Sequence, residues 1–394
     1  IHALIADYDY RLFEIDEDEL PRFFQERDFS GINVTIPYKQ AVIPFLDEIS
    51  DEAKKIGAVN TIVKKGGKLF GFNTDFFGMR ALIKSAGLDL ENKTVLILGT
   101  GGTSKTAVEV SKSLGATEIV KVSRTKSSDT VTYDEAYEKF SGADVIINTT
   151  PVGMFPNADK TPVDVKKFKN LQGVIDAVYN PLRTNFVLDA ESIGAKGRGG
   201  LYMLVAQAVY ASALFLDIAA DESVIDKTYA RILKEKRNIV LCGMPSSGKT
   251  TVGKALANDF GKRFIDTDDV VVEKRKESIS DIFEKYGEGE FRKEERLAIE
   301  ELSKENGLVI ATGGGAVLDE NNVRALRRNG VILFLDRSLE NLVATADRPL
   351  SSDTEKLKNL FEKRYDVYKS CADAVIPADG EIADVVEKIK GVLL

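Results

Sequence analysis

The sequence predicts an α/β protein made of successive α/β parts, and three observations lead to this class. Residues 1–90 mix short β-rich segments with helical ones. From residue 93, apolar runs separated by helical segments are typical of the buried strands of a parallel sheet. At residue 237 a second series of such runs begins. A chain of 394 residues is long enough for more than one hydrophobic core.

Residues 1–90 contain three segments with a clear pattern. The alternating stretch "INVTIP" (32–37) predicts a strand. The stretch "TIVKKGGKLFGFNTD" (61–75) predicts a β-hairpin that turns at Gly66 and Gly67. The stretch "DFFGMRALIKSAG" (75–87) has helical spacing and ends on a glycine, as many helices do.

The later parts predict two parallel sheets. The strands of the first, which we expect to be doubly wound, lie in "KTVLILG", "EIVKVS", "DVIINTT" and "LQGVIDAVY". Those of the second lie in "RNIVLC", "GLVIAT", "VILFLD" and "ADAVIP". Two helices connect the sheets, up to about residue 236. Residues 201–220 are nearly all apolar, but Gln207 and Asp217 interrupt them and no basic flank anchors them, which favours a buried helix over a membrane span.

The composition narrows the class of protein. A net charge of −8 argues against a nucleic-acid partner, since phosphate backbones need clustered Lys and Arg. Two cysteines and one histidine predict buried thiols in a reducing compartment and make a zinc site a poor hypothesis. We therefore expect a cytoplasmic protein whose partners are small molecules, with neither nucleic acid nor membrane among them. The oligomeric state is not indicated.

The stretch "LILGTGGTSKTA" (96–107) is a candidate phosphate-binding turn, because it follows a predicted strand and opens a helix. Gly99 permits the tight turn, and Gly101 and Gly102 let the backbone approach a pyrophosphate at the helix N-terminus. Ser104 occupies the place of the last glycine in G-x-G-x-x-G. A glycine turn without a ligand therefore stays open as an alternative.

The end of the next strand indicates which dinucleotide would fit. A carboxylate there would bind the ribose 2′-hydroxyl of NAD. The chain instead has Ser123, Arg124, Thr125 and Lys126, which suit a 2′-phosphate. This pattern favours NADP over NAD, with an exposed basic turn as the alternative.

The stretch "GMPSSGKTT" (243–251) fits G-x-x-x-x-G-K-[ST] and is the most specific motif in the chain. Its amides would cradle the phosphates of ATP, Lys249 would reach the β- and γ-phosphates, and Thr250 would bind Mg²⁺. The expected nucleotide-binding residues are Gly243, Ser246, Ser247, Gly248, Lys249, Thr250 and Thr251.

Further polar residues follow this loop. The stretch "FIDTDD" (264–269) is expected to place Asp266 and Asp268 at strand alternation. Other candidates are Arg292 in "GEGEFRKEE", the glycines of "IATGGGAVL" (310–318), Arg348 in "DRPL" and Arg364 in "EKRYDVYKSC". Each arginine alone is better explained as a solvated charge on a helix, since charge-rich helices usually carry arginines for solubility.

In combination, the motifs of residues 1–236 resemble shikimate dehydrogenases. They are "NVTIPYK" (33–39), "GAVNTIV" (57–63), "GFNTD" (71–75), "GTGGTSK", "SRT", "NTTPVGM" (148–154), "DAVYNPLRT" (176–184) and "GGLYMLVAQA" (199–208). The resemblance implies a substrate-binding α/β domain at 1–90, a Rossmann-like NADP domain at 91–197, and helices at 198–236 that return to the substrate domain.

The resemblance also implies roles for residues. Lys39 and Asp75 become the catalytic pair, since a ketone reduced by hydride needs a proton at its oxygen and a carboxylate can orient the lysine. Thr35, Asn60, Thr74, Tyr179 and Gln207 would bind shikimate. The implied NADP contacts are Gly99, Gly101, Gly102, Thr103, Ser123, Arg124, Thr125, Lys126 and Gly200.

This sequence departs from the pattern of the shikimate dehydrogenase family at two places. Family members have a strand and a Ser-x-Ser loop before the segment that matches "IHALI" (1–5). Without those serines and that strand, we expect this chain to reduce 3-dehydroshikimate poorly while its last part works normally. Tyr202 stands where the family commonly has glycine.

Residues 237–394 resemble shikimate kinases, which implies a P-loop kinase domain with a parallel sheet. Arg292 and Arg364 would bind the carboxylate of shikimate, because guanidinium groups suit a planar anion. Asp268 would hold the hydroxyls and take a proton, Asp266 would help position Mg²⁺, and Gly314 would give a backbone contact. Arg348 would lie in a lid (341–356) and neutralise the transferring phosphoryl group. That lid lacks a second arginine that many relatives have before "RPL".

The two resemblances meet at one molecule, shikimate. They imply NADPH-dependent reduction of 3-dehydroshikimate to shikimate, followed by ATP-dependent phosphorylation of its 3-hydroxyl. The alternatives are a regulator that has lost catalysis, an NAD-linked dehydrogenase that prefers quinate, and a kinase for another polyol acid.

Overall fold

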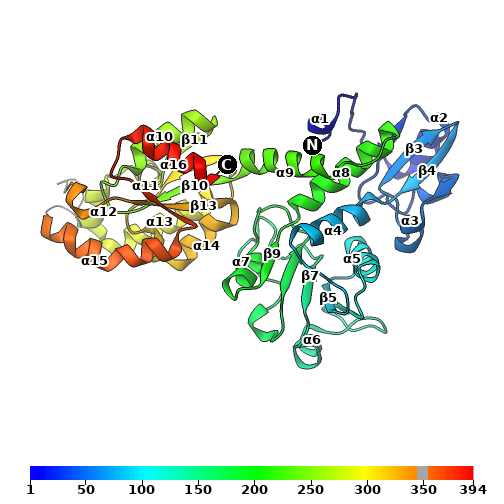
Figure 1. Ribbon diagram of the computed structural model, residues 1–394, viewed down its shortest axis with the longest axis horizontal. Coiled ribbons are helices and arrows are strands. Elements are labelled where there is room, and N and C mark those ends of the chain that lie inside the picture. Colours follow the sequence, from blue (N-terminus) through cyan, green and yellow to red (C-terminus); the bar gives the residue numbers. More distant parts are fainter. Residues whose placement is uncertain (344–353, 394) are drawn as a thin grey trace. The chain divides into compact units, whose positions relative to one another are not determined.

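The structure is a computed structural model that describes residues 1–343 and 354–393 (Figure 1). It divides into two compact units, Ile1–Ile232 and Leu233–Leu394. The division falls inside helix α9 (Glu222–Lys236), whereas the sequence motifs place the start of the last part at 237. Each unit is described below by itself.

The first sheet of unit 1 has the order β1-β3-β4-β2. The predicted hairpin is confirmed: β3 (Thr61–Lys65) pairs antiparallel with β4 (Lys68–Phe72), and Gly66 and Gly67 have φ angles of 57° and 80°. Positive φ at both turn residues is the conformation that glycine adopts without steric strain. The remaining strand bounds are β1 (Gly31–Asn33) and β2 (Glu48–Ile49).

The strand predicted at 32–37 is shorter in the structure. β1 ends at Asn33, and the backbone then turns, because the amide of Tyr38 donates to the carbonyl of Thr35 at 2.9 Å. The helices around this sheet are α1 (His2–Ile5), α2 (Leu20–Glu26), α3 (Asp51–Ile56), α4 (Thr74–Ser85) and α8 (Leu201–Leu216).

Helix α8 is largely buried, as the sequence predicted. It packs closely on α4, since a Cβ atom at Gly78 of α4 would lie 2.9 Å from the carbonyl oxygen of Met203. In the described part of the chain, no helix is both long and apolar enough to cross a membrane.

The second sheet of unit 1 is parallel, with the order β6-β5-β7-β8-β9. Its strands are β5 (Thr94–Leu98), β6 (Glu118–Val122), β7 (Val145–Asn148), β8 (Gly173–Asp176) and β9 (Lys196–Arg198). Its helices are α5 (Gly102–Ser113), α6 (Tyr133–Lys139) and α7 (Asn185–Ser192). The sequence did not predict β9, because Lys-Gly-Arg has no apolar side chain and joins the sheet by backbone pairing alone.

Unit 2 contains one parallel sheet with the order β11-β12-β10-β13-β14. Its strands are β10 (Asn238–Cys242), β11 (Arg263–Asp266), β12 (Leu308–Ala311), β13 (Gly330–Asp336) and β14 (Ala374–Pro377). Its helices are α10 (Lys249–Phe260), α11 (Thr267–Arg275), α12 (Ile279–Tyr286), α13 (Glu288–Leu302), α14 (Glu320–Asn329), α15 (Thr354–Cys371) and α16 (Ile382–Leu393).

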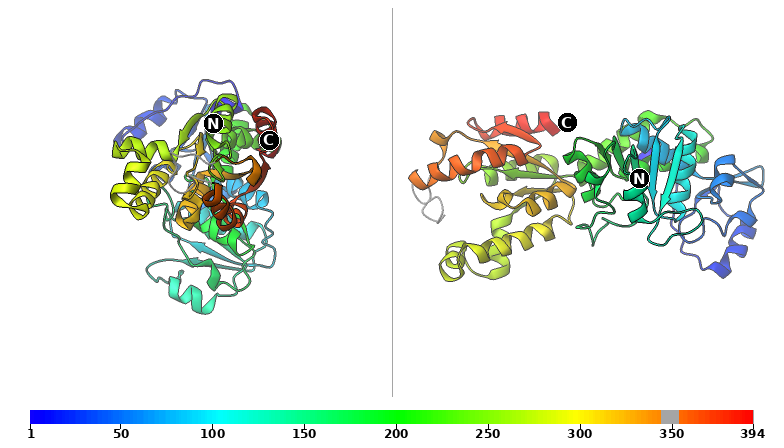
Figure 2. Two further views of the ribbon diagram at one scale, coloured as in Figure 1. Left: turned by 90° about the vertical axis from the view of Figure 1, so that its left-hand side faces the viewer. Right: turned by 90° about the horizontal axis from the view of Figure 1, so that it is seen from below.

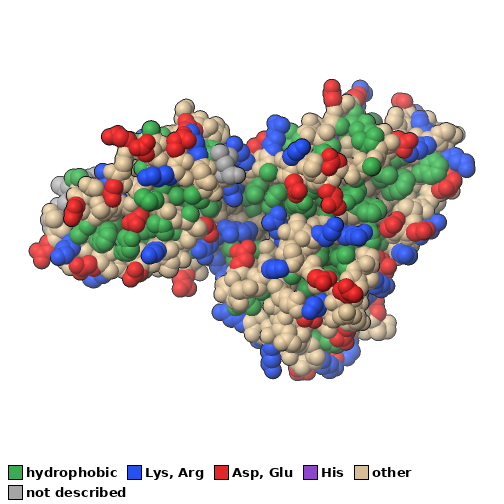
Figure 3. Space-filling model, in the orientation of Figure 1, with side chains coloured by type: hydrophobic (Ala, Val, Ile, Leu, Met, Phe, Trp, Pro, Cys, Tyr) green, Lys and Arg blue, Asp and Glu red, His purple; other side chains and the backbone are tan. Residues whose placement is uncertain are grey.

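Helices cover both faces of this sheet, so its strands are buried on both sides (Figure 2). Alternate residues of β10 enter separate cores: Ile239 lies in the core with α10 and α16, and Val240 lies in the other. The two free cysteines, Cys242 and Cys371, are both buried in the second of these cores. On the molecular face in Figure 3, acidic and basic side chains are interspersed.

One detail of the predicted pattern is wrong. Asp266 and Asp268 do not alternate along one strand, because β11 ends at Asp266 and α11 begins at Thr267. The carboxylate of Asp266 accepts a hydrogen bond from the amide of Asp268 at 3.1 Å and caps the helix. The two carboxylates therefore come from a helix cap and from the first helical turn.

The contact between α4 and α8 gives a stability prediction. Gly→Ala in a helix normally stabilises by about 1 kcal/mol, but at Gly78 the new methyl group would press on the backbone of α8. We expect Gly78→Ala to destabilise unit 1 by about 1–3 kcal/mol in denaturant unfolding. The matched control is Gly289→Ala in α13, where a Cβ meets nothing within 4 Å. An increase in stability for Gly78→Ala would contradict the packing.

Candidate active sites

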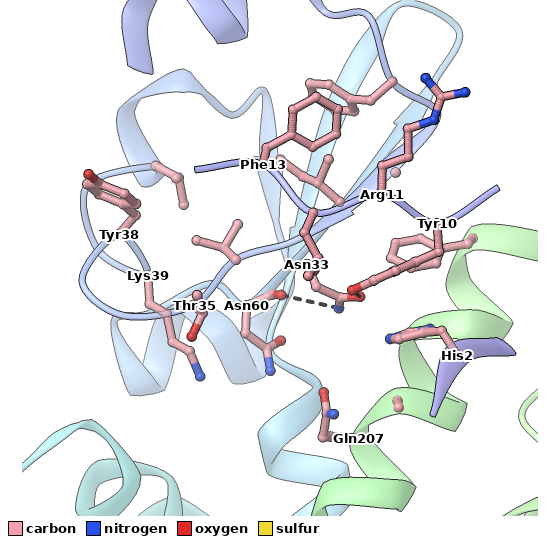
Figure 4. A pocket seen from close by; sticks show the side chains of 18 of the residues that line it. His2, Tyr10, Arg11, Phe13, Asn33, Thr35, Tyr38, Lys39, Asn60 and Gln207 are labelled. Atoms are coloured by element: carbon pink, nitrogen blue, oxygen red, sulfur yellow. Dashed lines mark hydrogen bonds between the residues drawn. The ribbon is translucent and has the colours of Figure 1, made fainter. Parts of the chain in front are cut away.

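Half of the residues predicted for the first site line one cleft in unit 1, with a volume of about 1900 Å³. The cleft exceeds an ordinary small-ligand pocket, and its walls include strand β1 of the first sheet as well as Thr103, Ala177 and Tyr179 from the helix and loop that follow strands of the second. The predicted residues that line it are Thr35, Lys39, Asn60, Asp75, Thr103, Tyr179, Gly200 and Gln207. Residues far apart in the sequence therefore meet at one place, as Figure 4 shows for several of them.

The ion pair between Lys39 and Asp75 is the main charged feature of this cleft. The Nζ of Lys39 lies 2.6 Å from Oδ2 of Asp75, and the side chains are 30% and 20% exposed. Lys39 follows β1 in a loop that is held by a hydrogen bond from the amide of Val59 to its carbonyl, at 2.7 Å. Asp75 lies in the first turn of α4, where the helix dipole favours a negative charge. Asp75 thus orients the ammonium group of Lys39, which is available as a proton donor in the cleft.

Asn60 has a fixed orientation beside this pair. It is 3% exposed, and its Oδ1 accepts hydrogen bonds from the amide of Thr74 at 2.7 Å and from the hydroxyl of Thr61 at 3.0 Å. Its amide nitrogen is therefore the group left to donate to a ligand. Figure 4 shows Lys39, Asn60 and Gln207 converging on the same space.

Thr74 and Asn33 support Asn60 from behind. Thr74 is 0% exposed, and its hydroxyl is within 3.2 Å of both Asn60 Oδ1 and Thr61 Oγ1. Thr74 therefore contacts Asn60 rather than the open cleft. Asn33 donates to the hydroxyl of Thr61 at 3.2 Å and lines the cleft. The sequence predicted no role for it. Its signal was its place at the start of "NVTIPYK".

The predicted dinucleotide turn lies at the carboxyl end of β5. Because β6 and β7 flank β5 on opposite sides, this is the position where the strand order reverses and α/β proteins bind ligands. Gly99 has φ +107°, and a Cβ atom there would lie 2.9 Å from Oγ1 of Thr149. At Gly101 and Gly102 a Cβ would meet nothing within 4 Å, so the turn is open where a pyrophosphate would approach the start of α5. These residues fit a dinucleotide.

The basic turn after β6 separates into a paired and an unpaired cation. Lys126 forms an ion pair with Glu135, with 2.5 Å between Nζ and Oε1. Hydrogen bonds from Lys126, from the backbone of Thr132 and from Lys139 lower the pKa of Glu135 to about 2. Arg124 is exposed and makes no hydrogen bond or ion pair with any described residue. Arg124 is therefore the cation that is ready for an added phosphate.

The other polar residues of this turn are engaged locally. The hydroxyl of Ser123 accepts from the amide of Thr125 at 3.4 Å. Thr125 is exposed.

The P-loop of unit 2 follows β10, which lies between β12 and β13 at a second point of strand-order reversal. Gly243 and Gly248 have φ angles of +147° and +90°, conformations that side chains rarely adopt. The Nζ of Lys249 donates to the carbonyls of Gly243 at 3.0 Å and Met244 at 2.8 Å, so the ammonium group lies over the loop.

The serines and threonines of the loop differ in exposure. Ser246 donates to the carbonyl of Val343 at 2.7 Å, and Ser247 is buried. Thr251 is exposed on α10. The hydroxyl of Thr250 donates to Oδ2 of Asp266 at 3.0 Å. Two oxygen ligands thus lie side by side, a donor set that suits Mg²⁺, which commonly takes few protein oxygens and keeps water and phosphate ligands.

Two of the three glycines after β12, Gly313 and Gly315, are crowded by polar side chains. A Cβ at Gly313 would lie 2.5 Å from Oδ1 of Asp268 and 2.6 Å from Oε1 of Glu295. A Cβ at Gly315 would overlap the guanidinium group of Arg292. Only glycine therefore leaves room for these side chains.

The carbonyl of Gly314, between them, accepts hydrogen bonds from Arg364 at 3.0 Å and from the hydroxyl of Tyr368. The structure thus brings Asp268, Arg292, Gly314 and Arg364 together. Arg348 and most of the predicted lid lie outside the described residues.

Glu295 is the member of this cluster that the sequence reasoning missed. It is 1% exposed, and its Oε2 lies 2.8 Å from Nη1 of Arg292. Burial raises the pKa of Glu295, and Asp268 nearby raises it further, while Arg292 and Arg364 lower it. The available signal was the spacing of three residues on one helix, which places Arg292 and Glu295 on the same face.

Fold and sites together define an α/β enzyme that uses nucleotides at two places. One unit has a dinucleotide turn and a lysine–carboxylate pair in a shared cleft. The other has a P-loop beside a cluster of acidic and basic side chains.

Comparisons with known proteins identify the families. Residues 1–62 match the family model of the shikimate dehydrogenase substrate binding domain, and residues 245–393 match that of shikimate kinase. The chain is 37% identical over 231 residues to a shikimate dehydrogenase (NADP(+)) of Clostridium beijerinckii, which spans 56% of this chain and 86% of that protein. The chain therefore belongs to the shikimate dehydrogenase family, and it also carries a shikimate kinase domain.

Solved structures include similar proteins. A chorismate mutase/shikimate 5-dehydrogenase fusion protein from Clostridium acetobutylicum is 33% identical, with a TM-score of 0.55, and the match covers 59% of this chain and 90% of that one. A shikimate kinase from Acinetobacter baumannii is 32% identical over 42% of this chain and 96% of that one, with a TM-score of 0.40.

Proposed function

We propose that this chain catalyses two consecutive reactions, the NADPH-dependent reduction of 3-dehydroshikimate to shikimate and the ATP-dependent phosphorylation of the 3-hydroxyl of shikimate. The observation that carries the first reaction is the Lys39–Asp75 ion pair, in a cleft that Thr103 and Gly200 also line. The second rests on the cluster around Gly313–Gly315, next to the P-loop. The family matches of both parts support the assignment.

Thr103 and Gly200 would lie beside bound NADPH, which would supply the hydride for the carbonyl carbon of the substrate. The ammonium group of Lys39 gives a proton to the carbonyl oxygen as negative charge develops there. Asp75 holds the ammonium group in place through their 2.6 Å contact. Asn60, with its free amide donor, and Thr35, Gln207 and Tyr179 would hold the hydroxyls and carboxylate of the substrate. Arg124 would bind the 2′-phosphate of the dinucleotide.

In the phosphorylation, Arg292 and Arg364 would bind the carboxylate of shikimate, and Glu295 would keep Arg292 in position. Asp268 would hold the reacting hydroxyl and accept its proton. When ATP binds, the ammonium group of Lys249 would leave the carbonyls of Gly243 and Met244 and would contact the phosphates instead. Thr250 and Asp266 would hold Mg²⁺, which neutralises phosphate charge when it is bound. The role of Arg348 stays a prediction from the sequence.

The alternatives differ in measurable ways. An NAD-linked dehydrogenase that prefers quinate would not need an unpaired arginine at the end of β6. A regulator without catalysis would not need Lys39, Asp75, Lys249 and Asp268, which are all present. A kinase for another polyol acid would be recognised in a panel of hydroxylated carboxylic acids, where shikimate would not be preferred.

Reciprocal variants test the two activities. We expect Lys39→Met to abolish reduction of 3-dehydroshikimate and leave phosphorylation of shikimate unchanged, because the proton donor lies in unit 1 alone. We expect Lys249→Ala to abolish phosphorylation and leave NADPH binding unchanged. Each variant serves as the control for the other in two spectrophotometric assays. Loss of both activities in either variant would argue against two independent sites.

The choice of coenzyme is tested at the basic turn. We expect Arg124→Ala to weaken NADPH binding by about one to two decades, the value of a hydrogen bond to a charged group, and to leave NADH binding unchanged. Lys126→Ala is the matched control, and its effect should be smaller because Lys126 is already paired with Glu135. Fluorescence titrations at low salt measure both. Equal affinities of the wild type for NADPH and NADH would refute the assignment.

A further inference from the structure

A carboxylate lies completely buried behind the cleft of unit 1, outside the machinery described so far. Asp176, the last residue of β8, is 0% exposed. Its Oδ1 accepts hydrogen bonds from Nδ2 of Asn148 at 2.9 Å and from the amide of Val178 at 3.0 Å. Its Oδ2 accepts from the hydroxyl of Thr184 at 2.5 Å. Burial raises the pKa of Asp176 to about 7, although these hydrogen bonds lower it.

One partner of Asp176 leads to the dinucleotide turn. The Oδ1 of Asn148 accepts from the amide of Thr150 at 3.0 Å and from its hydroxyl at 2.7 Å. A Cβ at Gly99 would lie 3.0 Å from Cγ2 of Thr150, so this threonine forms the support of the turn. The carboxylate is thus connected through Asn148 to the loop directly behind Gly99.

The other partner leads to the substrate side of the cleft. Val178, whose amide binds Asp176, accepts a hydrogen bond from the amide of Gly200 through its own carbonyl at 2.8 Å. Ala177, Tyr179 and Gly200 line the cleft. One carboxylate therefore joins the support of the cofactor turn to the turn that carries Tyr179 and contacts Gly200.

Burying a carboxylate without a counter-charge costs desolvation free energy, and Asp176 makes its hydrogen bonds to both turns despite this cost. A neutral amide of the same shape would offer acceptors and donors without the desolvation of a full charge. Sites where a rule of stability is broken in this way are often functional. We propose that Asp176 is a positioning residue of the dehydrogenase site, whose ionised carboxylate holds the cofactor turn and the Tyr179 turn in one register. This inference rests on the proposed reduction.

The ionised form of Asp176 fixes the positions of the two turns more firmly than the protonated form. Hydrogen bonds to a charged acceptor are stronger than those to a neutral one. A proton on Oδ2 would also turn an acceptor into a donor that faces the hydroxyl of Thr184, which is itself buried and caps α7. The charged side chains on the elements packed against β8 are Arg183, Asp189, Glu191, Lys196 and Arg198. None of them shifts the pKa of Asp176, which is set by burial and its hydrogen bonds.

The test compares Asp176→Asn with the wild type between pH 6 and pH 9. Asparagine imitates the protonated acid, since its oxygen still accepts from Asn148 and Val178. The ratio of wild-type to variant kcat/KM for NADPH should be near one at pH 6 and rise about fivefold to tenfold by pH 8.5, with a midpoint near 7. Using the ratio removes any pH dependence that the two proteins share. Asp134→Asn, an exposed change on α6 of the same unit, should give a ratio of one throughout.

Stability should move in the opposite direction. The folded pKa of Asp176 is above its unfolded value, so the wild type loses stability as pH rises toward 7. The unfolding temperature of Asp176→Asn should therefore gain on the wild type between pH 5 and pH 8, while its activity falls behind. Thr184→Val removes a hydrogen bond that lowers the pKa, and it should move the midpoint of the activity ratio to higher pH.

Specific outcomes overturn the inference. A ratio that is the same at pH 6 and pH 8.5, or a midpoint that Thr184→Val leaves in place, would make Asp176 a structural residue only. A wild type without NADPH-dependent reduction would contradict the proposed function instead. In that case the dissociation constant of NADPH, measured by fluorescence at both pH values, decides: equal values for wild type and Asp176→Asn would overturn the positioning role.

Discussion

Each unit depends on one constraint, that a phosphate group must approach the backbone at the start of a helix. Amide groups at a helix N-terminus have no partner within the helix, so they are available to an anion only if no side chain covers them. In unit 1 this requires the open glycines before and at the start of α5, and in unit 2 the two glycines of positive φ around the P-loop. Each loop leaves its sheet at the strand where the order reverses, because helices on either side diverge there and leave a crevice. The cores are built so that these two positions stay open.

The two sites treat charge differently. The Lys39–Asp75 pair is partly exposed, so its ammonium group can meet a substrate that enters from water. In the Arg292–Glu295 pair, the glutamate is almost fully buried. The carboxylates of Glu295 and Asp268 both lie against Gly313. Buried ion pairs contribute little to stability, because desolvation offsets the attraction between the charges. In unit 2 the pair with Glu295 keeps the guanidinium group of Arg292 at a defined place.

Much of the fold could be predicted from the sequence because the signals are local. The hairpin at Gly66-Gly67, the parallel strands of both sheets and the buried helix α8 each follow from a pattern within a few residues. The exceptions also have local reasons. β1 ends early because the backbone turns at Thr35. β9 has no apolar residue from which a strand could be predicted. Asp266 caps α11, so the residues after it begin a helix where a strand was expected.

The sequence by itself determined the class of fold, the two phosphate-binding loops and the set of residue types that the sites contain. The tertiary structure decided which of those residues are available. It pairs Lys126 with Glu135 and leaves Arg124 unpaired among the described residues, and it places Thr74 behind Asn60. It also reveals Glu295, which packs against Gly313 of a distant loop, and Asp176, whose partners Asn148 and Thr184 come from another strand and another loop. The physical reason is that burial and hydrogen bonding depend on neighbours in space, whereas a sequence pattern records only neighbours along the chain.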